Sequence, residues 1–477
     1  MVNTNMNENK KAGIENAFKA GVWYSLSAIA AKSISIITTP IFTRMMSTSD
    51  YGIAATFSSW YSIFLILCTA NLSYSHSRAK IDFPGQFTRY VGATHTLSYL
   101  ITGVLSVVAI LFLSPVAKFL DLNPALILLL FIYLFSGGTI NISQSENRYC
   151  YDYKKNIFIT LFTTVGTVLF TFLFLGIIKE NRYYAKILGF VVPSLLLAVW
   201  IVILQTRKRA FCINLDYWKY GLRISMPLIF HTISLNVLTQ SDRIVINKVC
   251  GSEAAGIYSL IYQYAMLINI ILNAINESWN PWFHDIYNER RCDLINKNIT
   301  PLNAFVSYIC IGCITVGPEA IMILGGEKYI SGQDCIFPIV LGLLAQFLFS
   351  HYIIIEVHHK QTQFTSLGTI IAAAINLGLN VALVPFFGFT CAAYTTLIAY
   401  LVLYLIHLYI TRHMLNIHLY NDLKIFGWFG VVALYGILSK ILYRTIMPRY
   451  ALFCIVTIAL FAIYKDVVLG LIKKKRS

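Results

Sequence analysis

The sequence predicts an all-α polytopic membrane protein with about 14 transmembrane helices. The 477 residues are 57% apolar and only 12% charged, whereas soluble domains carry about 25% charged residues. The mean hydropathy is high, at +0.67. Apolar runs of about 20 residues, the length that spans a bilayer, recur along the whole chain. These observations together argue strongly against a soluble enzyme.

The apolar runs define the predicted spans. They lack the alternation of polar and apolar residues that is typical of barrel strands, and only a helix satisfies each backbone polar group within its own segment in lipid. The expected spans are residues 20–42, 53–72, 91–113, 124–142, 157–178, 184–204, 224–246, 256–276, 299–323, 335–356, 364–387, 389–411, 424–443 and 448–471.

Lysine and arginine are distributed unequally between the two sides of these spans. If the N-terminus is cytoplasmic, the cytoplasmic segments hold 25 of the 37 basic residues and the opposite side holds 11, with Lys32 inside a span. Because basic loops stay in the cytoplasm, both termini are predicted to be cytoplasmic. The net charge of +16 is then explained by topology, and no nucleic-acid partner is expected.

An internal repeat indicates two related halves. The segment from Arg44 to Ile53 follows the first span, and the segment from Lys248 to Ile257 follows the seventh with the same base-to-Gly-Ile spacing, 204 residues later. The same offset places spans one to six close to spans seven to twelve, which predicts two six-helix lobes inserted the same way up. The predicted division is an N-terminal cytoplasmic tail (1–19), an N-lobe (20–204), a cytoplasmic linker (205–223), a C-lobe (224–411), and helices 13 and 14 with a basic cytoplasmic tail (412–477).

Polar residues follow helical spacing on one face of the first span and one face of the seventh. An ionisable group at mid-membrane depth usually faces a wet cavity, so both faces are expected to line a cavity between the lobes. For Lys32 the alternative is snorkelling to the interface, and Arg44 and Lys248 could equally be interfacial anchors. The two faces consist of Ser25, Lys32, Ser35, Thr39 and Thr43, and of Thr232, Asn236, Thr239, Gln240 and Arg243.

Three further residues are candidates for coupling to an ion gradient: Asp242, His231 and Glu356. Histidine titrates near neutral pH, although structural pairing would explain Asp242 about as well. A lone histidine on an apolar helix, such as His231, is more often a hydrogen-bonded packing residue. The sequence contains no P-loop, H-E-x-x-H or G-x-S-x-G motif. No metal or other cofactor is therefore expected, and a proton gradient, a sodium gradient or the substrate gradient would drive any transport.

Several short motifs resemble those of the bacterial O-antigen (Wzx-type) flippases, a family of polysaccharide transporters in the multidrug/oligosaccharidyl-lipid/polysaccharide exporter superfamily. Their order along the chain matches that family over residues 1–411. The motifs are Pro40-x-x-Thr43-Arg44, Ser49-Asp50-Tyr51-Gly52, Ser225-Met226-Pro227, Ser241-Asp242-Arg243, Glu253-Ala254-Ala255-Gly256-Ile257-Tyr258 and Trp279-x-Pro281-Trp282.

The resemblance implies a protein of the bacterial plasma (inner) membrane that moves an undecaprenyl-diphosphate-linked oligosaccharide from the inner to the outer leaflet by alternating access. It is not expected to be an enzyme. Membrane lipids, a polysaccharide polymerase and chain-length machinery are the implied partners. Basic cavity residues would attract the diphosphate, a role that falls on Lys32, Arg44, Arg78, Arg243 and Lys248, with Asn236 beside them.

Other functions stay open at this stage. The segment before Arg78, from Asn71 to Ser77, is more polar than the Gly-rich stretch usual in the family, and fourteen spans exceed the twelve commonly assigned to O-antigen flippases. Teichoic-acid, lipid II and small-molecule drug exporters are therefore alternatives. A membrane glycosyltransferase or polymerase is disfavoured, because the outer loops are short.

Overall fold

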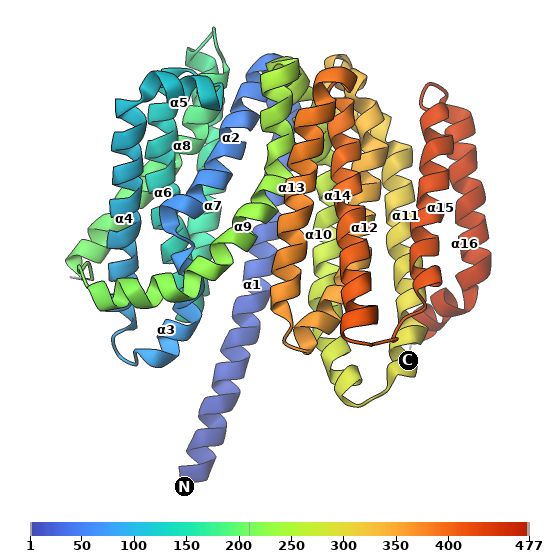
Figure 1. Ribbon diagram of the computed structural model, residues 1–477, viewed down its shortest axis with the longest axis horizontal. Coiled ribbons are helices and arrows are strands. Elements are labelled where there is room, and N and C mark those ends of the chain that lie inside the picture. The colour runs from blue at the N-terminus through green and yellow to red at the C-terminus, as the bar shows by residue number, and fades with distance from the viewer. Residues whose placement is uncertain (1, 209, 475–477) are drawn as a thin grey trace. The chain divides into compact units, whose positions relative to one another are not determined.

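The computed structural model describes residues 2–208 and 210–474, and side chains within 21–465 except those of Val22, Ser25 and Arg209. The described residues form helices and no strand (Figure 1). Ser25 of the predicted polar face, the side chains of the predicted N-terminal tail and the basic residues 473–476 lie outside the described side chains. The chain divides into two compact units, residues 1–256 and 257–477.

Unit 1 contains nine α-helices, one 3-10 helix and the first turn of a further α-helix among the described residues. α2 packs against α4, α6, α8 and α9, so it is central to this unit. The elements are α1 (Val2–Met45), α2 (Thr48–Thr69), η1 (Leu72–Ser75), α3 (His76–Asp82), α4 (Phe87–Leu111), α5 (Leu113–Leu120), α6 (Pro124–Tyr149), α7 (Tyr153–Ile177), α8 (Tyr183–Arg207), α9 (Leu215–Cys250) and the start of α10 (Ser252–Asn288).

Unit 2 contains the rest of α10 and the remaining helices. α12 packs against α11, α13, α14 and α15, and α16 packs against α11. The elements are α11 (Cys292–Gly325), η2 (Glu327–Cys335), α12 (Ile336–His358), α13 (Thr362–Phe387), α14 (Thr390–Tyr409), η3 (Ile410–Met414), α15 (Asp422–Ile441) and α16 (Ile446–Lys474).

Fourteen helices among the described residues are long and apolar enough to cross a membrane, which confirms the predicted fold class. Helices α9, α10 and α11, with 36, 37 and 34 residues, extend well beyond the predicted spans. At 1.5 Å per residue each exceeds the bilayer core of about 30 Å. Pro227 lies inside α9, which bends along its length (Figure 1). The unit boundary at Gly256 differs from the predicted linker, 205–223, and the two six-helix lobes stay a prediction.

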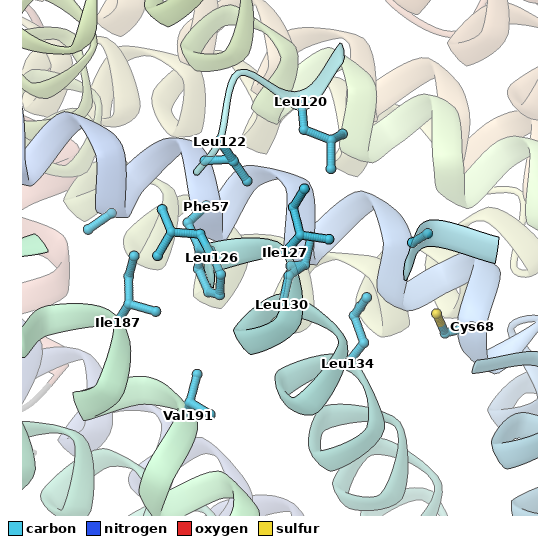
Figure 2. Close-up of a cluster of buried hydrophobic side chains, with 12 residues drawn as sticks. Phe57, Cys68, Leu120, Leu122, Leu126, Ile127, Leu130, Leu134, Ile187 and Val191 are labelled. Atoms are coloured by element: carbon cyan, nitrogen blue, oxygen red, sulfur yellow. The ribbon is translucent and has the colours of Figure 1, made fainter. Parts of the chain in front are cut away.

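The core of unit 1 includes a cluster of buried apolar side chains around Phe57 of α2. α6 contributes Leu126, Ile127, Leu130 and Leu134 at helical spacing, so its apolar face is turned toward α2. Figure 2 shows these side chains together with Ile187 and Val191 of α8. This packing fixes α8 beside α2 within the unit.

The C-terminal helix α16 of unit 2 is attached to α11 by a partly buried ion pair. Arg449 of α16 is fully buried and pairs with Glu319 of α11. Its guanidinium also donates to the carbonyl oxygen of Tyr443, at 3.3 Å. Because an unpaired charge inside a membrane bundle is costly, this pair specifies where α16 packs.

Candidate substrate site

The polar face predicted on the seventh span is present on α9, and much of it packs against neighbouring helices of unit 1. Asn71 donates to Thr232 Oγ1 at 3.0 Å, and Ser59 of α2 donates to Gln240 Oε1 at 3.1 Å. Asn247 donates to Asp121, which follows α5, at 2.7 Å. These hydrogen bonds join helices inside an apolar bundle, so this face has a structural role as well as an expected cavity role.

Arg243 lies where this polar face meets α2. Its guanidinium donates to Gln240 Oε1 at 2.5 Å and to the carbonyl oxygen of Thr239 at 3.3 Å. It also acts electrostatically on the hydroxyl of Tyr51, which is 5% exposed. The hydrogen bonds hold the guanidinium in place, so Arg243 is a fixed cation inside a spanning helix.

A second cation, Lys186 of α8, contacts the same tyrosine. Its ammonium group is 3.4 Å from the centroid of the Tyr51 ring, a close cation–π contact. None of the ion pairs found among residues 21–465 involves Lys186. Tyr51 therefore interacts with both Lys186 and Arg243, and we call these three residues the cationic cluster.

The turn between α1 and α2 sets the position of Lys186. Ser47 and Asp50 form a capping box at the start of α2, and the second carboxylate oxygen of Asp50 accepts the backbone N–H of Tyr183 at 3.2 Å. Arg182 donates to the carbonyl oxygen of Met45. The first turn of α8 is thus bound to this turn, which brings Lys186, one helical turn later, over Tyr51. The Ser-Asp-Tyr-Gly motif accordingly has a structural explanation.

The other predicted cavity residues are more dispersed. Lys32 and Arg44 are exposed on α1, where Arg44 donates to the carbonyl oxygen of Pro40 at 3.3 Å. The Asn236 amide donates to the carbonyl oxygen of Thr232 at 3.0 Å. Lys248 lies 5.8 Å from the ring centroid of Phe119. Of the predicted residues, only Arg243 is part of the cationic cluster.

Arg78 is exposed on α3 and pairs with Asp82, Nε to Oδ2, at 2.9 Å. Tyr220 of α9 donates to the same carboxylate oxygen at 2.7 Å. Hydrogen bonds from Tyr220 and from Arg78 hold the pKa of Asp82 below its ordinary value. Arg78 therefore has an anionic partner already, which reduces its capacity to attract a substrate anion.

The predicted coupling residues have different surroundings. Asp242 is 1% exposed within α9. His231 is half-buried, and its Nδ1 has no hydrogen-bond partner among the described residues. Glu356 is fully buried in unit 2 and accepts a hydrogen bond from His407, at 2.8 Å. Ion coupling through any of them stays a prediction.

Two residues that sequence reasoning missed are Lys186 and His407. Counting loop charges assigns Lys186 to the outer side, because it lies just inside the start of its span. His407 is a lone histidine in an apolar run, and such a histidine is more often a packing residue than a functional one. Among the described residues, no group of three His, Cys, Asp or Glu is placed to hold a metal ion.

Comparison with known families identifies the chain. The family model described as "Polysaccharide biosynthesis protein" matches residues 17–287, more than half of the chain. The chain belongs to this family. The match includes all of the cationic cluster, and it confirms the resemblance to polysaccharide transporters that the motifs indicated.

Individual relatives of this chain are distant in sequence. "Lsg locus putative protein 1" of Haemophilus influenzae is 23% identical over 279 residues, 57% of this chain and 67% of that protein. "Man(5)GlcNAc(2)-PP-dolichol translocation protein RFT1" of Kluyveromyces lactis is 27% identical over 118 residues, 24% of this chain and 20% of that protein. The lipid II flippase MurJ in an inward closed conformation is similar in fold, with a TM-score of 0.71 at 14% identity, over 94% of this chain and 100% of that one.

Proposed function

We propose that this protein is a flippase that translocates an undecaprenyl-diphosphate-linked oligosaccharide from the inner to the outer leaflet of the bacterial plasma membrane. The proposal rests on the cationic cluster in a member of the polysaccharide biosynthesis family: Lys186 and Arg243, on two spanning helices, both interact with Tyr51. A diphosphate that leaves water loses several kcal/mol of hydration. Fixed cations along its path offset that loss, and arginine adds bidentate hydrogen bonding to phosphate oxygens.

The relatives support the same kind of cargo. One of them is named as a lipid II flippase and another as a translocation protein for a PP-dolichol-linked oligosaccharide. A small-molecule exporter would need acidic residues to hold a cationic drug, whereas the cluster here is basic. O-antigen is the proposed pathway. Both termini are expected in the cytoplasm, with a polymerase and chain-length machinery acting on the exported unit.

Alternating access is the proposed mechanism. Lys32, Arg44, Asn236 and Lys248 would contact the headgroup at other depths, with the cationic cluster as its strongest binding point. Binding must be weak enough for release, so we expect no more than two or three of these cations to contact the headgroup at any one depth. The ring of Tyr51 attracts the ammonium group of Lys186 and leaves its charge in place. The substrate then competes with the ring for the ammonium group, which suits reversible binding.

The test is surface polysaccharide in the native host after deletion of the chromosomal copy, normalised to the amount of protein in the membrane. Lys186→Ala and Arg243→Ala should each reduce export at least about tenfold, the equivalent of one lost charge-assisted contact, and Lys186→Arg should retain much of it. Lys32→Ala should also impair export.

Lys179→Ala is the matched control, because Lys179 is an exposed lysine of the loop just before α8. It should export like the unaltered protein. Full export by the Lys186→Ala, Arg243→Ala double variant would contradict the proposed site. Sugar transfer catalysed by the purified protein would favour a glycosyltransferase instead.

A further inference from the structure

Unit 2 contains a buried pair of ionisable groups that the cationic cluster does not involve. Glu356 Oε1 of α12 lies 2.8 Å from His407 Nδ1 of α14, and both side chains are fully buried. The second carboxylate oxygen of Glu356 accepts a hydrogen bond from Thr365 Oγ1 of α13 at 3.0 Å. Three spanning helices therefore meet at one carboxylate.

The other ring nitrogen of His407 is open to protonation. Nε2 is buried and has no hydrogen-bond partner among the described residues. It faces Gly368 of α13, where a Cβ would lie 3.3 Å from it. Because Gly368 has no side chain, Nε2 of His407 lies beside the backbone of α13. When Nδ1 carries the proton donated to Glu356, the lone pair of Nε2 is unused.

The two helices that are hydrogen-bonded to Glu356 contain no other charged residue that could balance the pair. α13 contains no Asp, Glu, Lys, Arg, His or Tyr, and His407 is the sole Asp, Glu, Lys, Arg or His of α14. On the neighbouring turn of α12, the Tyr352 hydroxyl lies 3.4 Å from that of Tyr404 and donates to Asp422. Asp422 in turn pairs with Arg412 at 2.5 Å.

The remaining histidines of α12 have other contacts. His351 bonds to Asn303 of α11 through Nε2, at 2.9 Å, and His358 contacts His284 of α10 at 2.9 Å between Nδ1 atoms. A carboxylate with a neutral imidazole carries a net charge of −1. An isolated buried charge of this kind is costly in a membrane protein, and one additional proton removes it.

We propose that Glu356 and His407 form the proton-binding site through which unit 2 senses a proton gradient. A proton from water adds to Nε2 of His407, and the carboxylate–imidazole pair becomes a neutral carboxylate–imidazolium pair. No other bond changes. Because the pair joins α12 and α14 and is bonded to α13, gain or loss of this proton alters how the three helices hold together. The coupling role rests on the proposed transport function, whereas proton binding does not.

Infrared difference spectra of the full chain in lipid nanodiscs, between about pH 5 and about pH 8, test the binding. The imidazole bands of the unaltered protein should change between the two conditions, and Glu356→Gln and His407→Gln should each lose the part of this change that comes from the pair. His351→Gln, a buried histidine on the same helix, is the matched control and should keep the change. Thr365→Val removes one hydrogen bond to the carboxylate and should shift the midpoint without abolishing the change.

A difference spectrum that is the same in the unaltered protein, Glu356→Gln and His407→Gln would overturn the proposal. In cells, a protonophore should reduce export by the unaltered protein, while the residual export of Glu356→Gln should no longer respond. An equal response of both would overturn the coupling role. A protein that binds the proton at this pair but exports no polysaccharide would instead refute the proposed function and leave the proton site intact.

Discussion

Gly52 of α2 lies against the backbone of the first turn of α10, and Gly256 of α10 lies against the backbone of the first turn of α2. A Cβ on Gly52 would lie 1.8 Å from the carbonyl oxygen of Ser252, and a Cβ on Gly256 would lie 2.0 Å from that of Thr48. Thr48 and Ser252, like the two glycines, are 204 residues apart. The contact is therefore symmetric under the sequence repeat, which gives the shared Gly-Ile pattern a physical reason.

Alanine at either glycine should destabilise the protein. The colliding atoms are backbone, so they cannot move aside as a flexible side chain would, and overpacking of this kind costs about 1–3 kcal/mol or more. Thermal unfolding of the purified protein should show lower Tm values for Gly52→Ala and Gly256→Ala. Gly103→Ala in α4 is the control, because nothing lies within 4 Å of a Cβ there. Equal Tm values for all three variants would show that α2 and α10 do not approach so closely.

The ring of Tyr51, rather than its hydroxyl, should matter to Lys186. Tyr51→Phe keeps a ring face for the ammonium group, whereas Tyr51→Leu removes it and with it a contact of about 1–2 kcal/mol. Export should therefore fall more in Tyr51→Leu than in Tyr51→Phe. If the two variants export equally, the hydroxyl or the packing of residue 51 is what counts.

Breaking the ion pair between Arg449 and Glu319 should loosen the C-terminal helices. Removing one member of a fully buried pair costs about 3–5 kcal/mol, whereas replacing both with apolar residues is often neutral. Because the Glu319 side chain is 32% exposed, the cost of losing Arg449 should lie below that range. We expect Arg449→Met to lower Tm strongly, and the double variant Arg449→Met, Glu319→Leu to recover most of the loss. A double variant as unstable as the single one would indicate that the packing of Arg449, not its charge, holds α16.

Acid should destabilise unit 1 through His76. Burial, with a smaller effect from His95, lowers the pKa of His76 from 6.5 to about 3, and the neutral ring bonds to Ser145 at 2.9 Å and Thr94 at 3.2 Å. As pH falls, the unfolded chain binds a proton at His76 before the folded chain does. The contribution of neutral His76 to the free energy of unfolding is therefore complete above about pH 6.5 and decreases as pH falls toward about 3. At about pH 5 the loss is on the order of 2 kcal/mol.

Tm measured between about pH 7.5 and about pH 5 should fall less in His76→Gln than in the unaltered protein, because glutamine does not titrate. His413→Gln, which replaces an exposed histidine, is the control for the loss of an imidazole. An acid sensitivity of His76→Gln equal to that of His413→Gln would contradict this assignment.

The predicted orientation can be tested by labelling single thiols. Thr48 is buried and Ser47 caps α2, so Glu180, an exposed residue of the loop before α8, is the better outer probe. An impermeant maleimide should label Glu180→Cys in intact spheroplasts and should label native Cys150 only after permeabilisation. Because burial raises the pKa of the Cys150 thiol, labelling is best done at mildly alkaline pH. The opposite pattern would place the termini outside.

The spans could be predicted from the sequence, because a run of about 20 consecutive apolar residues is by itself the signal of a membrane helix. It also located the polar face of α9, but not its use in packing: the bond between Gln240 and Ser59 joins residues far apart in the chain. Lys186 was missed for the same reason. Only its contact with Tyr51, more than a hundred residues earlier, distinguishes it from a loop cation. Glu356 was predicted from its type and position, whereas its partner His407 depends on how α12 and α14 pair.

The contact between Lys186 and Tyr51 also bears on how the chain is inserted during synthesis. Lys186 lies in the first turn of α8, so its insertion costs at most about 2.5–3.5 kcal/mol, the value for a lysine at the centre of a membrane helix. A desolvated cation–π contact returns about 2 kcal/mol of this. Since α2 leaves the ribosome before α8, the tyrosine ring is already in the bilayer when the lysine arrives. A chain without that ring would be expected to lose yield during biogenesis, before any transport is attempted.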